Sequence, residues 1–325
     1  MIKVSVIIPV YGVEKYIERC ARSLFEQTLD SLEFIFVDDC SPDRSVEILQ
    51  ALVEEYRERL EAQNSVVRIE RMEANGGQAA ARRRGMELAR GEYVIHCDSD
   101  DWVLPQTYAL LYAKAVTEGA DVVICDHLVH NGKEVLARKK GIYRGTDPEV
   151  FLVDAARDRA NWSLWDKLVR RECLKNVVLY PKFNMGEDLV ITFQILSAQP
   201  RVAYVDEALY CYFVNTGSIT KHVTRKIALN NYNQLLGNVD TVKEALVRTG
   251  RYEHYRQLVD CLYYRTLNIL IKFIPDRDIY RTWRKCVKDQ HLDVMRNPYI
   301  KGHYKSRHIL LMMHLNFLFI RKHME

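Results

Sequence analysis

Apolar and polar residues recur in two periods along the first 126 residues, one typical of strands and one typical of helices. Short β-branched or aromatic runs predict five buried strands, at 4–10, 33–37, 66–70, 93–97 and 121–125. Apolar residues spaced three or four apart predict helices between them, at 13–24, 46–60, 77–90 and 106–118. Strands that alternate with helices indicate an α/β fold of the Rossmann-like kind, a mostly parallel sheet with helices on both faces.

The rest of the chain predicts an irregular region followed by a helical one. We expect an insertion or edge region to about residue 146. Helical patterns follow near 148–158, near 186–198 and over 226–290, the last with breaks at Gly250 and Pro275. The predicted division is a catalytic unit over 1–220 and a helical C-terminal region over 221–325.

The charge balance excludes one class of partner and shows an asymmetry. The 325 residues carry 47 Lys and Arg against 43 Asp and Glu, and 48% are hydrophobic, as in soluble globular proteins. A net charge of +4 argues against a dedicated nucleic-acid binder. Residues 265–325 hold 13 basic and 5 acidic residues, so a basic tail follows an acidic body.

The cysteines and the N-terminus indicate the compartment. The eight cysteines are scattered and form no Cys-x-x-Cys pair, which favours buried thiols in a reducing cytosol. The first ten residues read as a strand rather than a signal peptide. We therefore expect a cytoplasmic protein, with the inner face of the membrane as a candidate location.

Acidic residues gather where the predicted strands end. Ligands of open parallel sheets bind beyond the carboxyl ends of the strands. The residues at those ends include Tyr11, Asp38, Asp39, the Gly76-Gly77 turn, Asp98, Asp100 and Asp101. Clustered carboxylates raise each other's pKa and call for a cation or a hydrogen-bond donor. The Asp98-x-Asp100 spacing suits Mg²⁺ or Mn²⁺, and Arg82–Arg84 offer donors to phosphate oxygens.

Each of these features alone has a plainer explanation. The run 98–101 could cap a helix, Asp38 and Asp39 could be turn residues, and the three arginines could be a solvated helix face. Their convergence on one sheet edge favours a nucleotide-diphosphate and metal site instead.

Six motifs carry a resemblance to a known family. They are VSVIIPVYGVEKYIERC at 4–20, FIFVDDCSPDRS at 34–45, NGGQAAARRRGMELARGEYVIHCDSDD at 75–101, WDKLVRRECL at 165–174, FNMGEDLVITFQIL at 183–196 and ALYCYFVNTGSIT at 208–220. In this order the chain resembles the inverting family 2 glycosyltransferases of the GT-A fold, of the type that builds bacterial surface polysaccharides. The resemblance covers about 1–220.

The resemblance implies a role for each matching residue. Those expected on the nucleotide and donor side are Pro9, Tyr11, Asp39, Glu14 just beyond them, Arg82 near the phosphates and Asp98 at the ribose or sugar. Asp100 and Asp101 are expected to bind a divalent metal, Mn²⁺ or Mg²⁺. Arg83 stands where many relatives have asparagine, so it receives no role.

The same resemblance implies a catalytic base and an acceptor side. Asp188 matches the base, with Glu187 beside it, and Trp165 and Lys167 match a segment near the acceptor. Transfer from a nucleotide sugar, here expected to be a UDP-sugar, needs a carboxylate that takes the proton of the acceptor hydroxyl. Asp188 could also be an ordinary first-turn acid of a helix. The alternative function is a non-catalytic nucleotide-sugar-binding protein, which would be expected to lack Asp100 or Asp188.

The last apolar run leaves three interpretations open. Residues 309–320 (ILLMMHLNFLFI) are too few to span a bilayer. They could form a buried helix, a homodimer contact or an in-plane membrane helix with basic flanks over 291–325. The last would suit a lipid-linked acceptor, and a glycan acceptor fits the resemblance equally.

Overall fold

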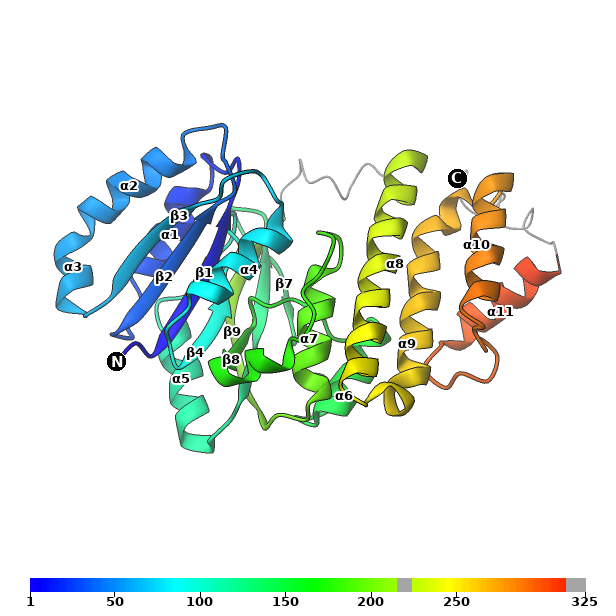
Figure 1. Cartoon of the computed structure of the whole chain (residues 1–325). Helices are drawn as coiled ribbons and strands as arrows, with labels where there is room; N and C mark the ends of the chain where they lie inside the picture. The colour runs from blue at the N-terminus through cyan, green and yellow to red at the C-terminus, as the bar shows by residue number, and fades with distance from the viewer. Residues whose placement is uncertain (215–223, 314–325) are drawn as a thin grey trace.

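The computed structural model describes residues 1–214 and 224–313, and its nine strands form one sheet (Figure 1). The first half of this sheet is parallel. Its strands lie in the order β3-β2-β1-β4 and comprise β1 (Val4–Val10), β2 (Leu32–Asp38), β3 (Val66–Arg71) and β4 (Tyr93–His96). The register pairs Pro9 with Val37 and Ile7 with His96, so β1 lies between β2 and β4.

The second half of the sheet is mixed. It contains β5 (Trp102–Val103), β6 (Val122–His130), β7 (Val135–Lys139), β8 (Lys167–Arg170) and β9 (Val202–Phe213). β6 and β9 are parallel to each other, whereas β8 runs antiparallel between β4 and β6. The five predicted strands are confirmed as β1–β4 and β6, and the α/β architecture with them. The expected parallel pairing does not extend to β5, β7 and β8, which make antiparallel pairs.

The helices follow the predicted positions closely. Those of the first two thirds are α1 (Ile17–Phe25), α2 (Ser45–Glu55), α3 (Arg57–Ala62), α4 (Gln78–Leu88), α5 (Thr107–Glu118), α6 (Pro148–Ala156), the 3₁₀ helix η1 (Arg171–Asn176) and α7 (Glu187–Ser197). Those of the C-terminal region are α8 (Arg225–Arg248), α9 (Tyr252–Thr266), the 3₁₀ helix η2 (Leu267–Phe273), α10 (Arg277–Asp289) and α11 (Gly302–Met312). The expected breaks at Gly250 and Pro275 both fall between helices.

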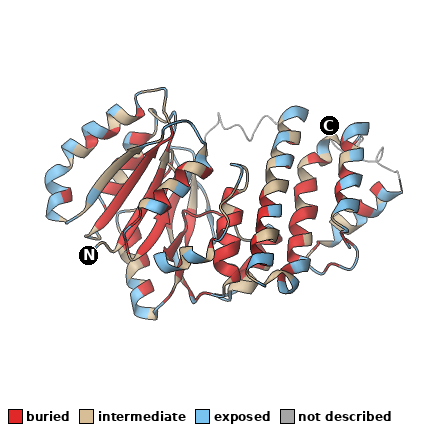
Figure 2. Ribbon diagram, in the orientation of Figure 1, coloured by how far each residue is buried: buried red, intermediate tan, exposed pale blue. Residues whose placement is uncertain are grey.

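The alternating side chains of the strands build two apolar clusters, one on each face of the sheet. On one face, Val6, Ile8 and Phe34 pack against α1, α2 and α5. On the other, Ile7 and Ile35 pack against α4, and the same cluster continues to residues of α7. A side chain at Gly85 of α4 would come within 2.3 Å of Ile7, so this glycine allows the close approach of α4 to β1. Figure 2 shows the buried residues of the central strands.

The C-terminal helices extend the second of these clusters. α8 packs on α7 and α9 (Figure 1). One contiguous set of buried residues runs from Ile7 in β1 through Val239 in α8 to Trp283 and Leu311. The predicted boundary at residue 220 stays a prediction, and the apolar cluster crosses it. Within residues 1–214 and 224–313, no helix combines the length and apolarity that a membrane crossing requires.

The apolar run 309–320 is described only at its start. Leu311 is buried in the second cluster, whereas Ile309, Met312 and Met313 are exposed. Residues 314–320 lie outside the described residues. The three interpretations of this run stay predictions.

Candidate active site

The turn between β3 and α4 is fixed by the carboxylate that follows β2. Asp39 is buried, and its two oxygens accept hydrogen bonds from the backbone N–H groups of Gly76 and Gly77, each at 2.7 Å. Gly77 has φ +79°, a conformation that favours glycine. The Asn75 side chain donates to the Asp39 carbonyl oxygen at 3.0 Å. Asp39 therefore sets the position at which α4 begins.

The other residues predicted at the nucleoside side divide into two groups. The Asp39 N–H donates to the Val10 carbonyl oxygen at 2.9 Å, so Asp39 lies beside Pro9 and the exposed Tyr11. Glu14 lies further along, where its Oε2 accepts from the Arg44 N–H at 3.2 Å. The structure thus brings Pro9, Tyr11 and Asp39 together and places Glu14 at the start of α2.

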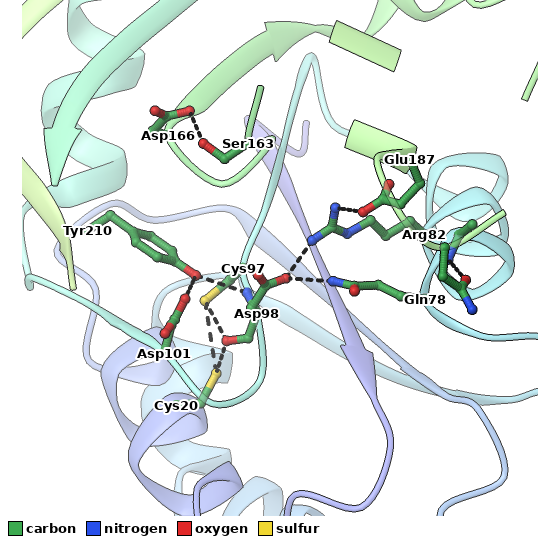
Figure 3. Close-up of polar contacts among 12 residues, drawn as sticks. Cys20, Gln78, Arg82, Cys97, Asp98, Asp101, Ser163, Asp166, Glu187 and Tyr210 are labelled. Atoms are coloured by element: carbon green, nitrogen blue, oxygen red, sulfur yellow. Dashed lines mark hydrogen bonds and ion pairs between the residues drawn. The ribbon is translucent and has the colours of Figure 1, made fainter. Parts of the chain in front are cut away.

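A buried arginine joins two predicted site residues. Arg82 of α4 is 3% exposed and donates to Asp98 Oδ1 at 2.6 Å and to Glu187 Oε1 (Figure 3). Gln78, one turn earlier, donates to the same Asp98 oxygen at 3.3 Å. Burial opposes the charge of Arg82, but Glu187, Asp98 and Asp188 outweigh it and raise its pKa. α4 therefore carries a fixed cation between β4 and α7.

Asp188 occupies the first turn of α7, beside Glu187. Gly186 caps this helix with φ +77°, and the Leu189 N–H donates to Asp188 Oδ1 at 2.8 Å. Burial raises the pKa of Asp188, and the nearby Arg82 partly offsets that rise. Burial likewise raises the pKa of Glu187, whose Oε2 has no hydrogen-bond partner among the described residues. Two adjacent carboxylates with raised pKa values thus stand beside one buried cation.

The acidic loop after β4 presents its carboxylates in different directions. Asp101 is buried and faces β9, where its oxygens accept from the Tyr210 hydroxyl at 2.6 Å and the Phe213 N–H at 2.7 Å. Asp100 is partly buried, and burial followed by the charge of Asp98 raises its pKa to about 6. Asp98 and Asp100 are therefore the carboxylates left for a ligand.

These two carboxylates fit a hard divalent cation. Burial and then the nearby charge of Asp98 disfavour the ionised form of Asp100 and raise its pKa, and a cation between the two carboxylates would favour that form. No three acidic, histidine or cysteine side chains are grouped for metal binding in residues 1–214 and 224–313. Mg²⁺ commonly takes one or two protein carboxylates and completes its shell with water and substrate phosphates. Asp101 as a second metal ligand stays a prediction, with both oxygens bonded to β9.

Trp165 and Lys167 lie just before and at the start of β8, and Trp165 contacts Tyr210, which bonds to the acidic loop. Trp165 stacks on Tyr210, with ring centroids 4.3 Å apart, and the Tyr210 hydroxyl accepts from the Asp98 N–H at 3.1 Å. Lys167 is buried, and its ammonium donates to Asp166 at 2.6 Å and to the Ser163 carbonyl oxygen at 2.7 Å. These contacts hold Tyr210 and Asp166 in place. The position of Trp165 and Lys167 on the acceptor side stays a prediction.

Sequence reasoning missed several residues that hold this site. The guanidinium carbon of Arg19 in α1 lies 4.0 Å from the ring centre of Trp102 and 4.5 Å from that of Phe213. The same guanidinium donates to the Asp100 carbonyl oxygen at 2.8 Å. Tyr210 and Gln78 were also unassigned, although both belong to the motifs quoted above. Their hydrogen bonds to Asp98 depend on tertiary proximity, which no local pattern reports.

The fold and this arrangement of carboxylates define a glycosyltransferase of the GT-A fold. The profile of Glycosyl transferase family 2 matches residues 5–183, more than half of the chain. The chain belongs to glycosyl transferase family 2. The family is one of enzymes, so the non-catalytic alternative is set aside.

Sequence and structure comparisons agree with this assignment. The uncharacterized glycosyltransferase EpsJ of Bacillus subtilis is 32% identical over 259 residues, which cover 78% of this chain and 70% of EpsJ. The structure of S. aureus TarS 1-349 with UDP-GlcNAc has a TM-score of 0.58 at 21% identity, covering 93% of this chain and 99% of that one. The Pyrobaculum calidifontis mannosyltransferase PcManGT with GDP-Man and Mn²⁺ has a TM-score of 0.52 at 14% identity, covering 97% and 85%. At these identities the two structures show the fold alone.

Proposed function

We propose that this enzyme transfers a sugar from a nucleotide-diphosphate donor, a UDP-sugar, to a hydroxyl of a glycan or lipid-linked acceptor, with inversion at the anomeric carbon. One observation carries the proposal. Asp188 stands at the N-terminus of α7, next to the buried Glu187–Arg82–Asp98 chain that begins at the end of β4. The neighbours in complex with UDP-GlcNAc and GDP-Man support a nucleotide-sugar donor.

In this proposal Asp188 is the general base. Its raised pKa makes it a better proton acceptor than an ordinary aspartate. It takes the proton of the acceptor hydroxyl as that oxygen attacks the face of the sugar opposite the leaving diphosphate, which inverts the configuration. Arg82 holds Asp98 and Glu187 in place, and its positive charge favours the ionised form of Asp188.

Donor binding falls to the strand ends. Pro9, Tyr11 and Asp39 are proposed to line the nucleoside pocket, with Glu14 at its margin, and Asp98 to contact the ribose or sugar. Asp98 and Asp100 would hold Mn²⁺ or Mg²⁺. When bound, such a cation supplies Lewis-acid stabilisation to the departing diphosphate. The Mn²⁺ in the PcManGT complex supports this choice of cofactor.

The test separates the base from its neighbour. We expect Asp188→Asn to lower kcat for transfer from a UDP-sugar by about 10²- to 10⁴-fold, the usual contribution of a general base. UDP affinity, measured by calorimetry, should stay within about twofold of the wild type because the amide keeps the shape of the side chain. Glu187→Gln is the matched variant, since Glu187 lies one residue away and is bonded to Arg82. Transfer by Asp188→Asn at the wild-type rate would exclude Asp188 as the base.

A further inference from the structure

A cavity lies on the side of Asp188 that faces the C-terminal helices. It measures about 370 Å³, within the range of small-molecule pockets, and most of its lining comes from α7, α8, α9 and η2. Most of its wall is apolar and includes Trp162, Leu189, Leu235, Val239, Leu262 and Ile269. Four of these six residues, Leu235, Val239, Leu262 and Ile269, come after both the family match at 5–183 and α7 in the chain.

Asp188 lines this cavity and also lies close to the residues that are proposed to bind the donor. Its carboxylate interacts electrostatically with Arg82 and Asp98, and it also lines the cavity wall. Its one hydrogen bond in the described part of the chain goes to Oδ1, from the Leu189 N–H. The other oxygen therefore remains for a hydroxyl inside the cavity.

Part of the remaining polar wall, at Arg265, Thr266 and Asp158, is bonded within the protein, and Asn268 and Tyr304 complete it. Arg265 donates to the Ala155 carbonyl oxygen at 2.8 Å and to Asp158, and Lys301 lies 3.7 Å from Asp158. Thr266 is buried and donates to the Tyr263 carbonyl oxygen. A free sugar would have to bury several hydroxyls against apolar side chains, which is unfavourable without hydrogen-bond partners. A hydroxyl carried on a hydrocarbon body meets no such penalty.

One helix that lines the cavity also carries exposed apolar side chains. Tyr304 of α11 lines the cavity, and the same helix and its C-cap carry the exposed apolar side chains of Ile309, Met312 and Met313. Exposed apolar side chains on one short helix suit contact with hydrocarbon. α11 therefore contributes to the cavity wall through Tyr304 and presents apolar side chains to the outside at its C-terminal end.

We propose that this cavity is the acceptor site and that it binds an acceptor whose sugar is joined to a hydrocarbon chain, as in a glycolipid. The inference rests on the proposed function and narrows its acceptor class. In this arrangement the acceptor hydroxyl meets Asp188, while the aglycone packs against α8 and η2. The C-terminal helices would then determine which acceptor is used.

The experiment compares octyl and methyl β-glycosides of glucose, galactose and N-acetylglucosamine. Binding to the protein loaded with UDP and Mn²⁺ is measured by calorimetry, with the octyl compounds kept below their micelle concentration. Two buried methylene groups already correspond to about tenfold in affinity, so we expect at least one octyl glycoside to bind about tenfold tighter than its methyl partner.

Two cavity variants and one control locate the effect. Leu235→Gln and Ile269→Gln keep the side-chain size at partly exposed positions and should each lower the octyl preference severalfold. Val247→Gln changes an exposed position on the same α8 helix and should leave the preference unchanged. The ratio of the two affinities within one variant does not depend on the fraction of folded protein.

The outcomes separate this inference from the proposed function. Equal binding of octyl and methyl glycosides, no binding of either, or a preference that survives in both cavity variants would overturn the acceptor assignment. UDP-sugar hydrolysis is measured in parallel on the wild type and on Asp188→Asn. If hydrolysis depends on Asp188 but no octyl preference exists, only the acceptor assignment fails. If no UDP-sugar is turned over, the proposed function fails and the acceptor assignment with it.

Discussion

Replacing Arg82 by methionine should destabilise the protein far more than the same change at its neighbour Arg83. Arg82 is almost fully buried and is the cation for Asp98 and Glu187, with Asp188 close by. Its loss leaves three carboxylates without the cation that they share, with Lys167 still near enough to offset part of the charge of Asp188. Removing one partner from a buried ion pair costs about 3–5 kcal/mol, and we expect a loss in this range.

Arg83 provides a matched control on the same helix. It is 56% exposed, pairs with Glu87 at 2.9 Å and lies 4.8 Å from the ring of Tyr180. An exposed i,i+4 pair and a cation–π contact each contribute about 0.3–1 kcal/mol, so Arg83→Met should cost about 1 kcal/mol. Urea unfolding followed by circular dichroism measures both losses. Similar values for the two variants would refute the central role of Arg82.

The pH dependence of the free energy of unfolding tests the same charged cluster in a second way. Burial raises the pKa of Glu187 and of Asp188 in the folded state above their values in the unfolded chain. The stability that such groups contribute is present at low pH and is lost as the pH rises through the folded pKa. Without Arg82 both folded pKa values rise further. The loss caused by Arg82→Met should therefore be larger at about pH 8 than at about pH 5, and a loss independent of pH would contradict the charge argument.

Three further changes test separate parts of the site. Asp100→Asn should weaken Mn²⁺ binding in the presence of UDP by about tenfold or more, as measured by calorimetry, because it removes one of two available carboxylates. Arg19→Gln should raise the donor KM several-fold with little change in kcat, because the ring contacts that hold the loop of Asp100 are lost; Arg22→Gln on the same helix should not. Gly186→Ala should lower the free energy of unfolding by about 1–3 kcal/mol, more than Gly12→Ala, because both have positive φ but only at Gly186 would the new methyl meet another side chain, 2.4 Å away.

Helices and strands can be predicted from the sequence where a segment has a continuous apolar run or a single hydrophobic period. β1, β2 and β4 are buried on both faces and read as continuous apolar runs, so their positions were predicted correctly. β8 has a charged residue at each end, Lys167 and Arg170, and β7 is mostly exposed, so neither forms an apolar run. β9 contains the exposed pair Asp206-Glu207, which interrupts its pattern. Such strands depend on pairing with distant partners.

The start of α2 shows how local signals compete. The pair Ser41-Pro42 is by itself typical of a helix start, yet α2 begins at Ser45, as the apolar spacing over 46–60 predicts. Asp38 accepts from the Ser41 N–H at 2.8 Å, and Asp43 accepts from the Ser45 hydroxyl at 2.6 Å. Two aspartates thus stabilise a turn where the sequence suggested a helix.

Some features of the candidate site can be predicted from the sequence, and others depend on tertiary contacts. The acidic residues at the strand ends follow from topology, because parallel strands bring their carboxyl ends to one edge. The link from Arg82 to Glu187 spans 105 residues, and no spacing rule predicts it. The direction of Asp101 toward β9 depends on a strand that the sequence did not predict.

The apolar cluster shared by the sheet and the C-terminal helices limits how this enzyme can be divided. The family match ends at residue 183, yet the helix that carries Asp188 is buried on almost every side, between the sheet and α8. A fragment ending at the family boundary would keep α4 and α6 but lose α7 and β9, and it would expose the apolar residues that α7 covers. Under the acceptor assignment proposed above, exchanging C-terminal regions between relatives would alter stability and acceptor choice together, so new acceptor preferences would have to arise through changes that also keep the sheet covered.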